Sequence, residues 1–200
     1  NNRFLLTFPE VKRPSKITIT AKINDQAPVK YPFTLVPPKK WEIYFVQHSH
    51  TDIGYTRPQS EILAEHMRYI DYALDYCDKT DNYPDDAKFR WTCESAWVTR
   101  EYLRSRPSSQ IERLRKRIAE GRIEVTGMYA NMAEISDEDL MYDFLQPLKE
   151  FEKLNIPVTT AMQNDVNGIA WCMPDYFQNT GVKYLIMGIN MTRSILPFDK

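Results

Sequence analysis

Residues 42–54 read EIYFVQHSHTDIG, an apolar run that leads into two histidines and an aspartate at alternate positions. The β-branched and aromatic residues of the run predict a strand over residues 42–47. His50 and Asp52 follow where that strand ends, and Gly54 allows a sharp turn after them. Since residues i and i+2 of an extended backbone project to the same side, His50 and Asp52 are expected to reach a common point.

The same arrangement of a short strand followed by a helix repeats along the chain. Further strands are predicted over residues 89–93, 122–126, 157–162 and 183–187. Helices are predicted over residues 58–79, 96–104, 108–120, 136–154 and 173–180. In the fourth helix, Ser136 and the acids after it are the expected N-cap, and Pro147 predicts a kink or a join between two helices. The alternation predicts an α/β fold with a parallel sheet, either open and doubly wound or closed as a barrel.

The first 37 residues have a different pattern. Three short segments over residues 3–8, 16–22 and 30–35 are rich in strand-forming residues. Proline and Asn-Asp, which favour turns, separate them, and this pattern predicts antiparallel strands. Pro37-Pro38-Lys39-Lys40 has the composition of a linker. We therefore expect residues 1–37 to be the end of a β module plus linker, and residues 38–200 to belong to the α/β domain.

Composition excludes several classes of function. Lys and Arg number 26 against 27 Asp and Glu, which leaves no basic surplus for nucleic acid. No window approaches the roughly 18 apolar residues that a membrane span needs. The cysteines, Cys77, Cys93 and Cys172, are too scattered for a disulfide framework or a thiolate zinc site. The chain begins without Met, so we expect a piece of a longer protein, and its compartment stays open, periplasmic or secreted locations included.

Acidic side chains follow each of the first four predicted strands of the α/β part. In parallel α/β folds the loops after the strands gather at one edge, where ligands bind. A histidine nitrogen beside a carboxylate oxygen is a normal pair of Zn²⁺ ligands, and Asp165 is the best-placed third ligand. The sequence therefore predicts one polar site that contains His50, Asp52, Glu94, Glu134 and Asp165.

Structural roles are open for several of these residues. Glu94 has a second interpretation as the cap of the helix that follows it, and Glu134 as a surface residue. His48 is expected to be structural, and His66, beside Glu65 and Arg68 in a predicted helix, to be a solvated surface residue. Trp97 is expected in the core.

The ordered motifs resemble the catalytic domain of glycoside hydrolase family 38, the α-mannosidase family. That family has His-[Ser/Thr]-His-x-Asp-x-Gly-Trp after its first barrel strand, and this chain has His48-Ser49-His50-Thr51-Asp52-Ile53-Gly54-Tyr55. A second family motif, Gln-x-Asp-x-x-Gly, is matched by residues 163–168 (QNDVNG). Strands that lead to acidic residues lie between them, at residues 89–94 and 121–134, so the resemblance covers about residues 41–190.

The resemblance implies a seven-stranded parallel β/α barrel, of which this chain is the first part. It implies one Zn²⁺ bound by His50, Asp52 and Asp165, with Asp165 also the catalytic nucleophile. Tyr55 would stack on the sugar where the family usually has Trp, with Glu94 and Glu134 beside the substrate. Val166-Asn167 replaces the usual Pro-Phe, and Ile169-Ala170 the usual His-Ser, which affects fine specificity. The family's fourth ligand and acid/base carboxylate lie further along the chain.

The implied function is retaining, zinc-dependent hydrolysis of terminal α-mannosides in oligosaccharides or glycans. A metal-dependent carbohydrate deacetylase on a related barrel is an alternative; it needs a further His pair at helical spacing, and the sequence has no HxxxH. A non-catalytic carbohydrate-binding relic is a third interpretation.

Overall fold

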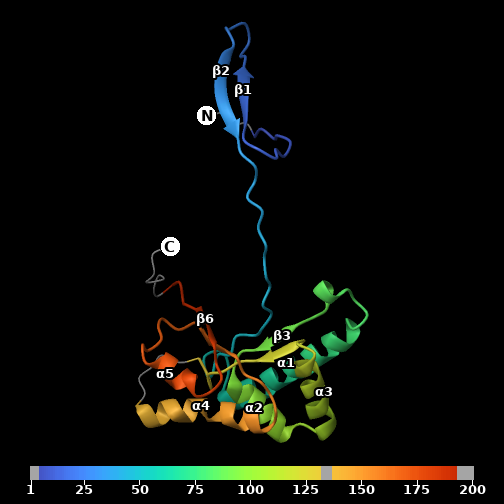
Figure 1. The fold of residues 1–200 in the computed structure, drawn as a ribbon, viewed down its shortest axis with the longest axis vertical. Coiled ribbons are helices and arrows are strands. Elements are labelled where there is room, and N and C mark those ends of the chain that lie inside the picture. The colour runs from blue at the N-terminus through green and yellow to red at the C-terminus, as the bar shows by residue number, and fades with distance from the viewer. Residues whose placement is uncertain (1–4, 132–136, 193–200) are drawn as a thin grey trace. The chain divides into compact units, whose positions relative to one another are not determined.

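The computed structural model describes residues 5–131 and 137–192 and divides the chain into two compact units, residues 1–45 and 46–200 (Figure 1). The first unit contains an antiparallel hairpin of β1 (Ser15–Ala21) and β2 (Val29–Leu35). Ile17 pairs with Phe33 and Ile19 with Tyr31, which gathers apolar side chains on one face of the hairpin. These two predicted strands are confirmed.

A third strand predicted for this unit, over residues 3–8, is wrong where it can be assessed. Residues 3 and 4 lie outside the described residues, and residues 5–8 belong to no strand. Leu5 is almost fully exposed, so this segment makes none of the side-chain packing that stabilises a strand.

The second unit is a mixed α/β fold with small parallel sheets. Strand β3 (Trp91–Cys93) pairs in parallel with β4 (Ile123–Val125), and β5 (Thr160–Asn164) pairs in parallel with β6 (Tyr184–Gly188). Single parallel bridges, His48 to Thr92 and Gly127 to Ala161, extend the pairing on either side. The pairing order therefore follows the chain order, which is how strands joined by helical crossovers succeed one another. The seven-stranded barrel itself is not shown by these short sheets.

The helices of the second unit are α1 (Gln59–Lys79), α2 (Ala96–Ser105), α3 (Ser108–Ala119), α4 (Glu138–Lys153) and α5 (Met173–Gln178), with a 3₁₀ turn at Asp85–Ala87. In Figure 1, α2, α3 and α4 lie below strand β3. Their apolar faces form two buried clusters, one around Phe151 and Val125 and one around Leu74 and Ile123. Trp97 is buried in the second cluster, as predicted.

Two predicted elements need correction. Residues 42–47 form no regular strand: the only strand-like pairing near them is the bridge at His48, with the Thr92 N–H donating to the Gln47 carbonyl at 2.8 Å. Ile43 and Phe45 are exposed, so the apolar run lacks the buried neighbours that order a strand. The fourth helix is one helix with Pro147 inside it, and its N-cap is Asp137, whose carboxylate accepts from the Leu140 N–H at 3.0 Å. Ser136 lies outside the described residues.

No helix in the described part of the chain is both long and apolar enough to span a bilayer.

Candidate metal centre

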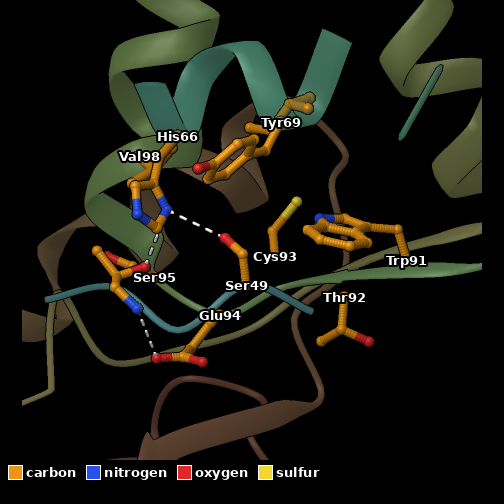
Figure 2. Close-up of a pocket in the computed structure, with 11 residues that line it drawn as sticks. Ser49, His66, Tyr69, Trp91, Thr92, Cys93, Glu94, Ser95 and Val98 are labelled. Carbon is orange, nitrogen blue, oxygen red and sulfur yellow. Dashed lines mark hydrogen bonds between the residues drawn. The ribbon is translucent and has the colours of Figure 1, made fainter. Parts of the chain in front are cut away.

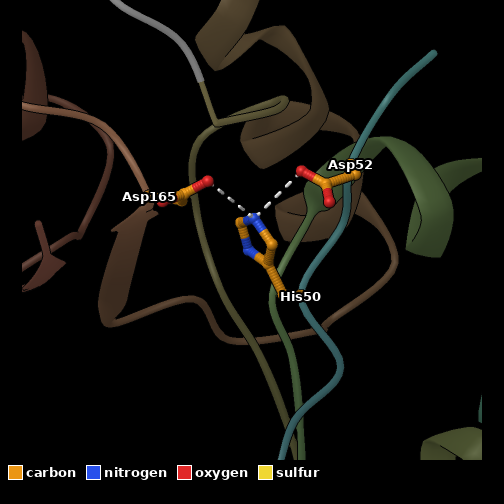
Figure 3. Close-up of side chains that lie close together, drawn as sticks. All are labelled: His50, Asp52 and Asp165. Atoms are coloured by element: carbon orange, nitrogen blue, oxygen red, sulfur yellow. Dashed lines mark ion pairs between the residues drawn. The ribbon is translucent and has the colours of Figure 1, made fainter. Parts of the chain in front are cut away.

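Three of the predicted site residues meet beside the bridge at His48 and the carboxyl end of β5. His50 Nε2 lies 3.2 Å from Asp52 Oδ1 and 3.8 Å from Asp165 Oδ2, and one ligand atom from each residue falls within 4.8 Å of the others (Figure 3). Asp52 follows His50 by two residues, whereas Asp165 arrives from the loop after β5. The structure therefore brings together the three residues that the sequence places at strand ends.

One nitrogen atom of this cluster has an unusual environment. His50 Nε2 is buried and has no hydrogen-bond partner, although two carboxylates surround it. A buried polar atom without a partner costs on the order of 1–3 kcal/mol, so such atoms usually have a further role. A metal ion between the imidazole and the carboxylates would satisfy all three groups, and the donor set, one nitrogen and two oxygens, suits Zn²⁺. The residues present therefore fit the ion.

Asp165 is held by an unusual backbone conformation. Its φ is +60°, the left-handed region that non-glycine residues rarely adopt. Its N–H donates to the Gly188 carbonyl at 2.6 Å, which ties the turn after β5 to the end of β6. Strained residues of this kind cluster at functional sites, and here the turn places a half-exposed carboxylate (50% of the side chain) beside His50.

Glu94 contacts His50, and none of the side-chain surface of Glu94 is exposed. Its Oε1 accepts from His50 Nδ1 at 2.9 Å, from the Thr51 N–H at 3.2 Å and from the Asn131 amide. Burial raises the pKa of Glu94, but the hydrogen bonds from Asn131 and Thr51, with the charge of His50, outweigh it, so the pKa is lowered overall. Glu94 is therefore a buried carboxylate whose Oε1 accepts three hydrogen bonds.

Sequence reasoning missed most of the residues around Glu94. His48 Nδ1 lies 2.5 Å from Glu94 Oε2, a close ion-pair contact without hydrogen-bond alignment. The Asn131 side chain bonds Glu94 through its amide nitrogen and accepts from the Asn164 N–H at 2.8 Å through its oxygen. Asn131, in the loop after β4, thus connects the loop after β3 with the end of β5. Its place in a loop after a predicted strand was the one signal for it in the sequence.

His66 is not a solvated surface residue, contrary to the prediction. It lies on the buried face of α1, is 8% exposed, and its Nδ1 lies 3.3 Å from Ser49 Oγ and 3.4 Å from Thr51 Oγ1. Burial lowers the pKa of His66, the largest influence on it. Figure 2 shows His66 above Ser49 in a small cavity that Glu94 and Cys93 also line. His66 therefore supports the loop that carries His50.

The remaining predicted site residues are placed as follows. Tyr55 is 85% exposed, in the loop before α1. The cap interpretation of Glu94 is wrong, because Ser95 occupies the N-cap of α2 and no side chain caps that helix. Glu134 lies outside the described residues. An open cleft adjoins His50 and Asp52 and is also lined by Arg57, Tyr69 and Trp91.

Two comparisons with known proteins gave matches, one to a family model and one to solved structures. A model of the glycosyl hydrolases family 38 N-terminal domain matches residues 40–190. Among solved structures, the chain is similar to an alpha-mannosidase from Enterococcus faecalis V583, at 22% identity and a TM-score of 0.56 over 71% of this chain and 16% of that one. It is also similar to a glycosyl hydrolase family 38 protein from Enterococcus faecalis, at 22% identity and a TM-score of 0.53, again over 71% and 16% of the two chains.

The similarity to these two structures shows the fold, and the matched part spans only 16% of their length. A search of curated proteins gave no significant match. The family match extends over both polar segments of the candidate metal centre, from His50 and Asp52 to Asp165. This chain belongs to glycosyl hydrolase family 38 and carries that family's N-terminal domain.

Proposed function

We propose that this chain is part of a zinc-dependent retaining glycosidase that hydrolyses terminal α-mannosides in oligosaccharides or glycans. One observation carries the proposal: His50 Nε2 is buried without a hydrogen-bond partner between the carboxylates of Asp52 and Asp165. Family membership supports the reaction class, because glycoside hydrolysis requires carboxylates at the scissile bond. We further propose that the parallel strands form the first part of a β/α barrel.

His50, Asp52 and Asp165 would hold the metal ion. When bound, Zn²⁺ supplies a Lewis acid and a template for neighbouring sugar hydroxyls. The protein's own contribution is to fix the donors: Asp52 follows His50 on the same loop, and the backbone bond from Asp165 to Gly188 fixes the third. Both carboxylates face the imidazole nitrogen (Figure 3).

Asp165 is the proposed nucleophile. Its carboxylate oxygen forms a bond to the anomeric carbon while the bond from that carbon to the leaving oxygen breaks, and a carboxylic acid gives the leaving oxygen a proton. The carboxylate that gave up its proton then takes one from a water molecule, whose oxygen bonds the anomeric carbon as the bond to Asp165 breaks, and the sugar leaves with retained configuration. The half-exposed side chain of Asp165 is accessible to a substrate, unlike that of Glu94, which is fully buried. The acid is expected further along the chain, as in the family.

Tyr55 and Glu134 stay proposed substrate contacts. The exposed ring of Tyr55 is available for stacking on a sugar. Glu94 has no exposed surface, which favours an indirect role for it.

Gly188→Ala is expected to lower kcat/KM of the complete enzyme by about 10- to 100-fold, since small misplacements of reacting groups have effects of that size. A Cβ at Gly188 would lie 2.6 Å from Asn164 Oδ1, so the Asn164 side chain must move, and the neighbouring Asp165 is bonded to the Gly188 carbonyl. Steady-state kinetics on an aryl α-mannoside measures the change. Gly127→Ala is the matched control, because a Cβ there meets nothing closer than 3.5 Å. Equal losses in both variants would show that the contact with Asn164 does not matter.

Chelation tests the proposed function directly. Release of an aryl α-mannoside by the complete enzyme is followed before a chelator is added, after it, and after zinc is returned. Activity that falls below detection and returns with zinc is the expected result, because the metal would organise both substrate and nucleophile. Activity that chelation does not change would rule out the proposed role of the metal. If no mannosidase activity were found under any of the three conditions, the deacetylase or the binding relic would be favoured.

A further inference from the structure

We infer that Glu94 is a positioning residue, which holds His50 through its Nδ1 so that Nε2 faces the metal. The inference rests on the proposed function, because the nitrogen that Glu94 orients is the proposed zinc ligand. Glu94 belongs neither to the described metal-ligand group nor to the surface that a substrate can reach. Its role is therefore to act through His50.

The hydrogen bond to His50 determines which ring nitrogen carries the proton. An ionised carboxylate only accepts hydrogen bonds, so His50 Nδ1, at 2.9 Å from Glu94 Oε1, must be the donor. In the neutral ring the lone pair is then on Nε2, the buried atom that faces Asp52 and Asp165. Carboxylates commonly fix metal-binding histidines in this way.

Glu94 cannot readily leave His50 for another partner. The Thr51 N–H and the Asn131 amide donate to the same oxygen, and His48 lies against the other oxygen at 2.5 Å. These partners come from the loop before α1 and the loop after β4, whereas Glu94 itself follows β3. The carboxylate is thus anchored on two sides. Through Glu94, the orientation of His50 depends on three separate segments of the fold.

His48 gives Glu94 a second imidazole contact, a close approach to Oε2 without hydrogen-bond alignment. It makes the parallel bridge to Thr92, two residues before Glu94, so the two side chains are brought together by the pairing itself. Residues i and i+2 share a side of an extended backbone, which places His48 and His50 on the same carboxylate. The unexplained first histidine of the His-Ser-His sequence therefore has a physical role: it anchors the carboxylate that orients the second.

Glu94→Gln tests the inference, because it keeps the shape of the side chain and removes its charge. We expect the zinc affinity of the complete protein, measured by competition with a chromophoric chelator, to fall by about 10- to 100-fold. Glu124→Gln is the matched control: Glu124 is exposed on β4 and lies outside the metal group, so its affinity should equal that of the wild type. Unchanged affinity in Glu94→Gln would overturn the inference.

A second readout uses the metal-free protein. Nitrogen-15 NMR of the histidine side chains reports the tautomer, and we expect the proton of His50 on Nδ1 in the wild type and redistributed in Glu94→Gln. An Nε2–H tautomer in the wild type would overturn the inference without any variant, even if Glu94→Gln does not fold. A wild type that binds no zinc but shows the Nδ1–H tautomer would refute the proposed metal function and leave the orientation by Glu94 in place.

Discussion

Asp165→Ala is expected to lower kcat of the complete enzyme by at least about a thousand-fold, because removing a covalent nucleophile removes the step on which turnover depends. Asp165 lies beside His50, and its carboxylate is also accessible to a substrate. Its removal should therefore lower kcat more than the loss of a metal ligand that is not also the nucleophile. The measurement is steady-state hydrolysis of an aryl α-mannoside with zinc in excess. Excess zinc separates the loss of the nucleophile from weaker metal binding.

Asp143→Asn is the control for Asp165. Asp143 is exposed on α4 and lies outside the described metal group, so its activity should stay at the wild-type level. A 2-fluoro mannosyl reagent provides an independent test, because it traps the glycosyl-enzyme bond on the nucleophile. An adduct found on another residue, or near-normal turnover in Asp165→Ala, would show that Asp165 is not the nucleophile.

His50→Ala is expected to weaken zinc binding by more than about 100-fold, a larger loss than a supporting residue gives. His50 supplies the nitrogen donor of the candidate cluster, and its other ring nitrogen is hydrogen-bonded to Glu94. Without it, Asp52 and Asp165 are left as two carboxylates with no nitrogen donor between them, a set that suits Zn²⁺ less well. Zinc content after dialysis and competition with a chelator measure the loss.

His66→Ala is the matched control for His50. His66 is buried close to the same loop but is not a member of the described metal group. We expect His66→Ala to keep zinc stoichiometry and to lower thermal stability, since it removes packing beneath Ser49 and Thr51. If His66→Ala lost zinc as completely as His50→Ala, metal binding would depend on the loop's integrity and the assignment of His50 as ligand would fail.

The alternation of strands and helices could be predicted from the sequence because most elements have a local pattern of apolar residues. Periodic apolar residues such as Ile62, Ile70 and Leu74 mark the buried face of α1 regardless of what covers it. The strand over residues 42–47 was wrong for the converse reason: its apolar composition predicts a strand, but a ladder needs neighbours, and only His48 has one through its bridge to Thr92.

The convergence of His50, Asp52 and Asp165 also followed from the sequence, through a rule of topology. Carboxyl ends of parallel strands meet at one edge, so polar residues after successive strands are brought close even when they are far apart along the chain. The structure has this arrangement for His50, Asp52 and Asp165, whereas their binding of zinc is a prediction that the experiments above test.

The sequence by itself determined the α/β class and the proximity of His50 to Asp52, because both depend on local periodicity. Only the tertiary structure decided what Glu94, His48, Asn131 and His66 do. Glu94 is hydrogen-bonded to His50 across 44 positions of sequence, and His66 contacts Ser49 because α1 packs its buried face there. Contacts of this kind arise when separate elements pack together, so the spacing of residues along the chain does not predict them.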